Sequence, residues 1–245
     1  MTLKLKYLTM KNFEQEDQEL LHKESGILTA KLQRRSFLQY AGAGAAGVAL
    51  IAAGCKKDNN GSFSAGVDLG SGDVGILNYA YALEQLEAAF YDAVVKTPYA
   101  NISATELALL TDIRDHELAH REFFKKALGS AAIPGLEVDF TKINFSVRAE
   151  VLGTAKAFED LGVSAYNGAG KLIKSADYLV VAGKIVSVEA RHAALIRDLI
   201  ENGSFANLEV VDANGLDKAR TPKEVLTIAQ SYIKTTINGA NLPTS

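Results

Sequence analysis

The 245-residue sequence is poor in sulfur, with one cysteine and two methionines. A single cysteine excludes an intrachain disulfide and any zinc or iron–sulfur site built from several thiolates. Both methionines, Met1 and Met10, lie at the very start of the sequence. They leave the remainder without the methionine axial ligands that some haem proteins use, so we expect no haem of that kind.

Positive charge is also in short supply. The chain has 26 lysines and arginines against 29 acidic residues, and residues 1–54 hold seven of the basic ones but only five of the acidic ones. The rest of the chain therefore has a net charge of −5 and no basic stripe, so we expect no nucleic-acid partner. A hydrophobic fraction of 48% and a charged fraction of 22% fit a globular chain rather than a disordered one.

One pattern of acidic, aromatic and imidazole residues occurs twice. Each copy has a Glu seven residues before a Tyr and, roughly thirty residues after that Glu, a Glu-x-x-His unit. The first copy consists of Glu84, Tyr91, Glu117 and His120, and the second of Glu159, Tyr166, Glu189 and His192. On an α-helix, residues seven apart share a face, and so do residues three apart. Four such helices would offer four carboxylates and two imidazoles to one interior, which is the ligand set of a carboxylate-bridged di-metal site.

These residues resemble the ferritin-like superfamily, and within it the bacterial exported branch of ferritin-like domain or desiccation-related proteins. The resemblance covers about residues 73–201 and is carried by residues 78–91, 115–124, 157–168 and 188–197. It implies an all-α fold, a ferritin-like four-helix bundle with a long crossover between its second and third helices. It also implies a centre of two iron or manganese ions. The implied ligands are Glu84, Glu117, His120, Glu159, Glu189 and His192, and Tyr91 and Tyr166 would hydrogen-bond carboxylates from outside the ligand set.

Two other residues are reserve ligands. Glu87 lies near the same apolar stripe as Glu84, but Glu84 is the one that mirrors Glu159 in its spacing to a tyrosine, so we interpret Glu87 as a solvated residue at the rim. His116 precedes His120 by four residues and could share its face. We interpret Arg197 as a surface charge and expect Arg191 to turn away from the core.

The helical period and the capping signals predict four long helices and one short one. Their ranges are 73–95, 103–128, 146–169, 175 or 177 to 201, and 222–237. Asp73 and Ser103 are predicted N-caps, Ser103 with Glu106 in a capping box, and Thr221 is the predicted N-cap of the short helix. Residues 130–145 have no helical period and suit the crossover. The predicted domains are an N-terminal extension with an export signal (1–54), a flexible tether (55–72), the bundle (73–203) and a C-terminal extension with the short helix (204–245).

The first 55 residues indicate export. Residues 33–39, Gln-Arg-Arg-Ser-Phe-Leu-Gln, look like a twin-arginine signal, and the apolar run 41–54 has fourteen residues, which is too short for a spanning helix. Cys55 follows this run directly and resembles the lipidated cysteine of a lipoprotein. We therefore expect a protein of the periplasm or cell envelope that contacts the membrane only through a lipid anchor, and an oligomer is compatible with this.

Four glutamates could simply be surface charges, since Glu is almost never buried unpaired. If they point inward, however, burying them without cations would cost many kcal/mol, so metal is expected. Carboxylate and imidazole donors suit iron or manganese. The resemblance then implies oxidation of metal, or consumption of oxygen or peroxide, in stress protection, with no catalytic residue separate from the metal centre. The alternative is a non-catalytic envelope protein that keeps the bundle for structural or metal-binding ends.

Overall fold

The computed structural model describes residues 66–245. The predicted twin-arginine signal, the apolar run 41–54 and Cys55 lie outside the described residues, so they stay predictions. Within residues 66–245, no helix combines the length and the apolar character needed to cross a membrane.

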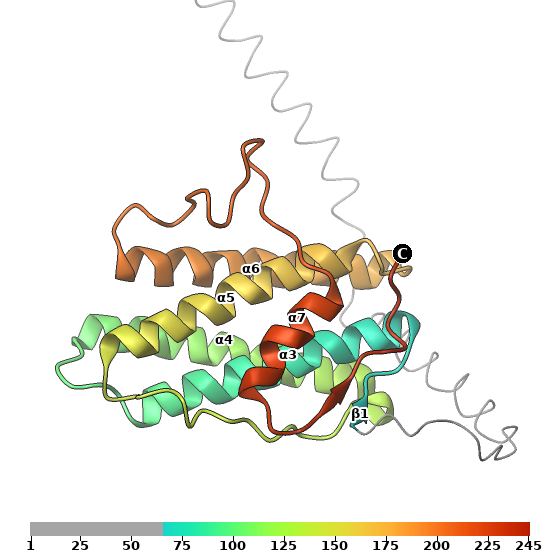
Figure 1. The fold of residues 1–245 in the computed structure, drawn as a ribbon, viewed down its shortest axis with the longest axis horizontal. Helices are drawn as coiled ribbons and strands as arrows, with labels where there is room; N and C mark the ends of the chain where they lie inside the picture. The colour runs from blue at the N-terminus through green and yellow to red at the C-terminus, as the bar shows by residue number, and fades with distance from the viewer. Residues whose placement is uncertain (1–65) are drawn as a thin grey trace, which may run out of the picture. The chain divides into compact units, whose positions relative to one another are not determined.

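Four long helices dominate the described part of the chain (Figure 1). They are α3 (Gly72–Lys96), α4 (Ala104–Leu128), α5 (Arg148–Gly170) and α6 (Ala176–Ile200). α3 packs along α4, α5 packs along α6, and α3 also contacts α5. The remaining elements are the short strands β1 (Val67–Asp68) and β2 (Ile237–Asn238), the short helix α7 (Pro222–Ala229) and the 3-10 turns η1 (Gly129–Ala131) and η2 (Gln230–Tyr232). The predicted all-α bundle is confirmed.

The N-cap predicted at Ser103 is confirmed at the start of α4, but only half of the predicted capping box forms among the described residues, because the Glu106 carboxylate accepts from Tyr99 and Arg148 instead. Ser103 Oγ accepts a hydrogen bond from the Glu106 amide at 3.1 Å, as a capping residue should. The start of α3 differs from the prediction. α3 begins one residue earlier than predicted, with Ser71 at its N-cap. Asp73 lies in the first turn, where its carboxylate accepts hydrogen bonds from the amides of Lys174 and Ser175 at 2.8 and 2.9 Å. The predicted cap therefore ties α3 to the connection between α5 and α6.

The long crossover between α4 and α5 runs over α3, which holds it through two buried amide side chains. Asn78 donates to the Ala131 carbonyl at 2.9 Å and accepts from the Ile133 amide at 3.0 Å. Gln85 accepts from the Leu136 amide at 2.9 Å. These side chains satisfy backbone groups that an irregular segment cannot pair within itself. The crossover predicted for residues 130–145 is confirmed.

The C-terminal segment packs on the outside of α5. α7 begins after Thr221, the predicted N-cap. A capping box that was not predicted forms there, in which the Thr221 amide donates to Glu224 Oε2 at 2.8 Å and Thr221 Oγ1 accepts from the Glu224 amide. It is shorter than predicted, because the chain leaves the helix after Ala229 and pairs β2 in parallel with β1. A Cβ at Gly168 would lie 1.7 Å from the Arg220 carbonyl oxygen, so only glycine allows this approach.

Burial is distributed unevenly over the four helices. α3 buries sixteen of its 25 residues and α5 buries thirteen of 23, whereas α4 and α6 bury five and six of 25. The reason is that the crossover lies on α3 and the C-terminal segment on α5. Among the described residues, α4 and α6 are therefore covered less than α3 and α5, and more of their residues are in contact with solvent.

Arg197 on α6 contradicts the sequence interpretation, because it is only 2% exposed. Its guanidinium donates to both carboxylate oxygens of Asp160, from Nε at 2.9 Å and from Nη2 at 2.7 Å. It also donates to Asn207 and Glu209. The segment after α6 folds back over this arginine, which periodicity along one helix cannot reveal. Arg191, on the same helix, is exposed as expected.

Candidate metal centre

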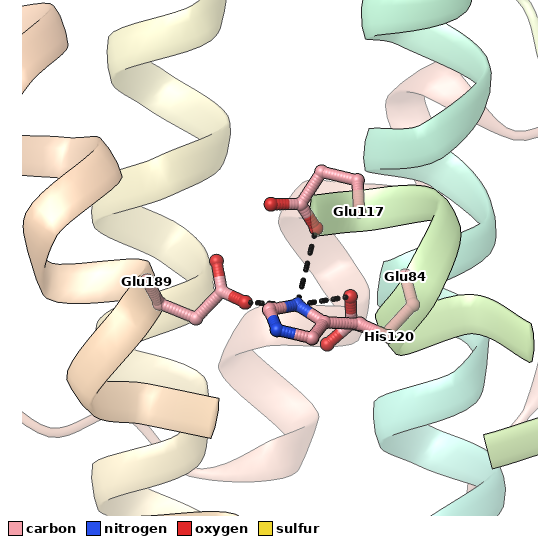
Figure 2. A group of neighbouring side chains, drawn as sticks. All are labelled: Glu84, Glu117, His120 and Glu189. Carbon is pink, nitrogen blue, oxygen red and sulfur yellow. Dashed lines mark ion pairs between the residues drawn. The ribbon is translucent and has the colours of Figure 1, made fainter. Parts of the chain in front are cut away.

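The six predicted ligand residues come together in the middle of the bundle. Glu84 comes from α3, Glu159 from α5, and each Glu-x-x-His unit from α4 or α6. All four carboxylates are fully buried, and His192 is 4% exposed. Figure 2 shows four members of the group, Glu84, Glu117, His120 and Glu189, with the imidazole of His120 lying between the carboxylates. Each residue lies well inside its helix, so regular backbone hydrogen bonding fixes its direction.

The first group of donor atoms surrounds His120. Its Nδ1 lies 2.9 Å from Glu189 Oε1, 3.4 Å from Glu84 Oε2 and 3.7 Å from Glu117 Oε2. These four residues each offer one ligand atom, and the four atoms lie within 4.8 Å of one another. Three helices contribute to the group, because Glu117 and His120 belong to the same Glu-x-x-His unit.

The second group repeats this arrangement around His192. Its Nδ1 lies 2.8 Å from Glu117 Oε1, 3.6 Å from Glu159 Oε2 and 3.7 Å from Glu189 Oε2. Glu117 and Glu189 therefore belong to both groups, each offering one oxygen to either side. Two neighbouring four-donor groups joined by two carboxylates are the arrangement expected of a bridged pair of ions.

The two tyrosines of the repeat hold the carboxylates that are not shared. Tyr91 donates to Glu159 Oε1 at 2.5 Å, and Tyr166 donates to Glu84 Oε1. In each case the tyrosine of one half supports the glutamate of the other half. Because Oε1 is occupied by the tyrosine, each of these carboxylates presents only its Oε2 to the neighbouring histidine.

The donor atoms fit a pair of metal ions. Eight buried atoms of the cluster make no hydrogen bond: Glu84 Oε2, Glu159 Oε2, both oxygens of Glu117, both oxygens of Glu189, His120 Nδ1 and His192 Nδ1. These are the same atoms that form the two groups, four to each. The two histidine nitrogens lie 2.8 to 3.7 Å from these carboxylate oxygens without forming a well-aligned hydrogen bond. Buried polar atoms in native proteins almost always form hydrogen bonds, so a cluster that contacts itself in this way indicates a missing ion or ligand.

The pKa values of the acidic and imidazole groups in the metal-free centre also indicate that the centre suits metal ions. Burial raises the pKa of Glu159 to about 8 and raises the pKa of Glu84 well above its usual value. Burial also acts to lower the pKa of both histidines, but the surrounding carboxylates, Glu117 first, raise each to about 12. Two protonated imidazoles thus partly compensate the acidic cluster when no metal is bound. Metal ions would supply that positive charge instead, releasing the protons.

Glu87 is not the solvated rim residue that the sequence suggested. It is 4% exposed and lies outside both four-donor groups. A Cβ added at Gly162 would lie 3.0 Å from Glu87 Oε1, so the glycine on α5 leaves room for this carboxylate. Burial, together with the charges of the nearby glutamates, raises its pKa well above the usual value. The sequence alone could not place Glu87, because its surroundings depend on which residue of α5 lies opposite.

Replacing Glu87 by glutamine is expected to stabilise the metal-free protein, and more so as pH rises. Because the pKa of Glu87 is raised by folding, its contribution to stability is largest below the unfolded value of 4.5 and is lost as pH rises through the folded value. Relative to wild type, the variant should gain on the order of 2 kcal/mol in unfolding free energy at pH 8 and much less at pH 5. Urea unfolding in the presence of a chelator measures this. Glu201→Gln, at an exposed residue, is the control, and a gain independent of pH would contradict the argument.

His116, the other reserve ligand, takes no part in either group. It is exposed on α4, and its Nδ1 lies 2.9 Å from Nε2 of His192, with the two rings within 9° of parallel. The four-residue spacing from His120 suggested a shared face. The structure instead places His116 against the histidine of the other half, a contact that only the packing of α4 near α6 can reveal.

Comparison with known families agrees with this geometry. A family model described as a ferritin-like domain matches residues 72–202, more than half of the chain. The matched residues include all four long helices and both four-donor groups. No curated protein matches the chain.

Proposed function

The chain belongs to the ferritin-like domain family, and from that premise we propose that its centre binds two ions of iron or manganese and reacts with oxygen or peroxide. Glu84 and His120 would hold one ion, Glu159 and His192 the other, and Glu117 and Glu189 would bridge them. Carboxylate oxygens with one imidazole per ion are the donors that these metals favour. The observation that carries the proposal is the set of eight buried donor atoms without hydrogen bonds, divided equally between two positions.

When bound, the metal pair supplies two electrons, one per ion on passing from +2 to +3, which with two protons balance the reduction of oxygen to hydrogen peroxide or of peroxide to water. The protein contributes position and charge. Tyr91 and Tyr166 orient the carboxylates of Glu159 and Glu84. The four glutamates, all fully buried, compensate the ionic charge and keep the reacting groups away from bulk water.

The proposed setting is the cell envelope, where such a reaction would protect against oxidative or drying stress. This part of the proposal rests on the twin-arginine-like residues 33–39, on the apolar run and on Cys55, together with the resemblance to exported desiccation-related proteins. The second candidate is a protein that binds metal in the same groups without redox turnover. It is favoured by the depth of the centre, because complete burial of the four glutamates suits a structural ion as well as a reactive one.

Metal loading followed by an oxygen-uptake assay tests the proposal. The full-length protein is loaded with Fe²⁺ in the absence of oxygen. It is then freed of excess metal and mixed with oxygenated buffer. We expect two ions per chain, and oxygen uptake in step with oxidation of the iron. Arg191→Ala, an exposed change next to a proposed ligand residue, should behave as wild type. Two bound ions without oxygen or peroxide consumption would favour the non-catalytic candidate, and no stoichiometric binding would overturn both.

A further inference from the structure

The proposed ligand residues and the two tyrosines match between the halves of the centre, but two neighbouring positions do not. Glu87 corresponds to Gly162, and the residue before the glutamate of each Glu-x-x-His unit also differs. Glu117 corresponds to Glu189 and His120 to His192, so the residue before each glutamate should correspond too. That residue is His116 on α4 and Val188 on α6. The repeat is therefore broken on one side by an imidazole that the other side does not have.

The break changes the surroundings of only one of the two proposed ligand histidines. His192 has His116 Nδ1 2.9 Å from its Nε2, while its Nδ1 faces the carboxylates of the second group. His120 also presents its Nδ1 to carboxylates, but among residues 66–245 no side chain or carbonyl forms a hydrogen bond with its Nε2. The two histidines thus have similar contacts at Nδ1, which faces the carboxylates, but different contacts at Nε2.

A neutral imidazole that binds a metal through Nδ1 carries its proton on Nε2. With metal bound in this way, the Nε2 proton of His192 would be donated to His116 Nδ1, which lies 2.9 Å away. Such an acceptor fixes the tautomer and the orientation of a metal-binding histidine and increases its basicity, and losing it typically costs 10–100-fold in metal affinity. His116 can accept because it is exposed, so that its own Nε2–H can face water.

We propose that His116 is a positioning residue for His192, and that it makes the metal position of Glu159 and His192 the tighter of the two. The inference rests on the proposed function, since it concerns the same two positions. It goes further by making them unequal: one position fills first and holds its ion more firmly. Because the side chain of Val188 has no hydrogen-bond acceptor, the metal position of Glu84 and His120 is the weaker one.

Two single-ion backgrounds separate the positions for a test. Glu84→Ala removes a ligand found only in the first group, and Glu159→Ala removes one found only in the second. His116→Val copies the other half of the repeat, whereas His116→Asn keeps an acceptor oxygen near the place of Nδ1. The probe is Co²⁺ alone, followed by calorimetric titration and by its visible absorption, neither of which depends on turnover.

We expect His116→Val to weaken Co²⁺ binding by about 10–100-fold in the Glu84→Ala background and by less than about threefold in the Glu159→Ala background. His116→Asn should restore most of the affinity, and Val188→His should strengthen binding in the Glu159→Ala background. The same loss in both backgrounds, no loss in either, or no rescue by asparagine would overturn the inference. If either background fails to fold, the first binding step of the otherwise wild-type protein with His116→Val or His116→Asn decides in the same way. Absence of Co²⁺ binding by the wild type would instead overturn the proposed function itself.

Discussion

Replacing Glu117 by alanine is expected to remove both ions from the centre, whereas Glu84→Ala and Glu159→Ala should each remove only one. The reason is that Glu117 offers an oxygen to both four-donor groups, while each of the other two belongs to a single group. Loss of the shared carboxylate should weaken binding at each position by at least about 100-fold, which corresponds to roughly 2.7 kcal/mol. Metal content after anaerobic loading and gel filtration, measured for the three variants in parallel, gives the stoichiometries directly.

The matched control for this experiment is Glu122→Ala. Glu122 lies on the same helix as Glu117 but is exposed, so its loss should leave two ions per chain. Circular dichroism is needed to check that each variant is folded, because Glu117 is the carboxylate that interacts most strongly with both protonated histidines of the metal-free centre, and its loss leaves them less compensated. One tightly bound ion in Glu117→Ala would show that the carboxylate is not shared, and the arrangement of bridging residues given above would be wrong.

Chelation of the metal is expected to lower the melting temperature of the protein by roughly 10–20 °C. An ion present at about 100 times its dissociation constant stabilises the folded state by ~2.7 kcal/mol, so two ions contribute about 5 kcal/mol. For a domain of this size, each kcal/mol corresponds to about 2–4 °C. Differential scanning calorimetry with and without a chelator measures the difference.

The Glu117→Ala protein provides the internal comparison, since its melting temperature should not respond to the chelator. A wild-type melting temperature that is equally insensitive would mean that the ions contribute nothing to folding. The buried carboxylates would then have to be held by protonated His120 and His192 alone, whose pKa values near 12 allow this in the metal-free protein.

Much of this centre could be predicted from the chain because its geometry is local to each helix. A spacing of seven residues places Glu84 and Tyr91 on one face, and the spacing in Glu-x-x-His does the same for Glu117 and His120. Repetition of the pattern then identified the four helices that face one another. The ligand role of these residues is still a prediction, but the structure places all of their side chains together as the spacing required.

The residues that the sequence misplaced are those whose surroundings come from another element. Glu87 is buried because Gly162 on α5 leaves space for it, and Arg197 is buried because Asp160 and the segment after α6 close around it. The prediction that Asp73 is an N-cap was wrong for the same reason, since its hydrogen-bond partners lie about a hundred residues later in the chain. Periodicity describes one helix at a time and contains no information about the opposite surface.

The crossed tyrosines make the two halves of the bundle dependent on each other. Tyr91 of the first helical pair supports Glu159 of the second, and Tyr166 of the second supports Glu84 of the first. A single helical hairpin would therefore lack both a bridging oxygen and the hydroxyl that steadies its own glutamate. Two copies that exchanged hairpins would regain every one of these contacts. A hairpin separated from its partner would keep three of the four donors of one group and one of the four donors of the other, and could complete neither.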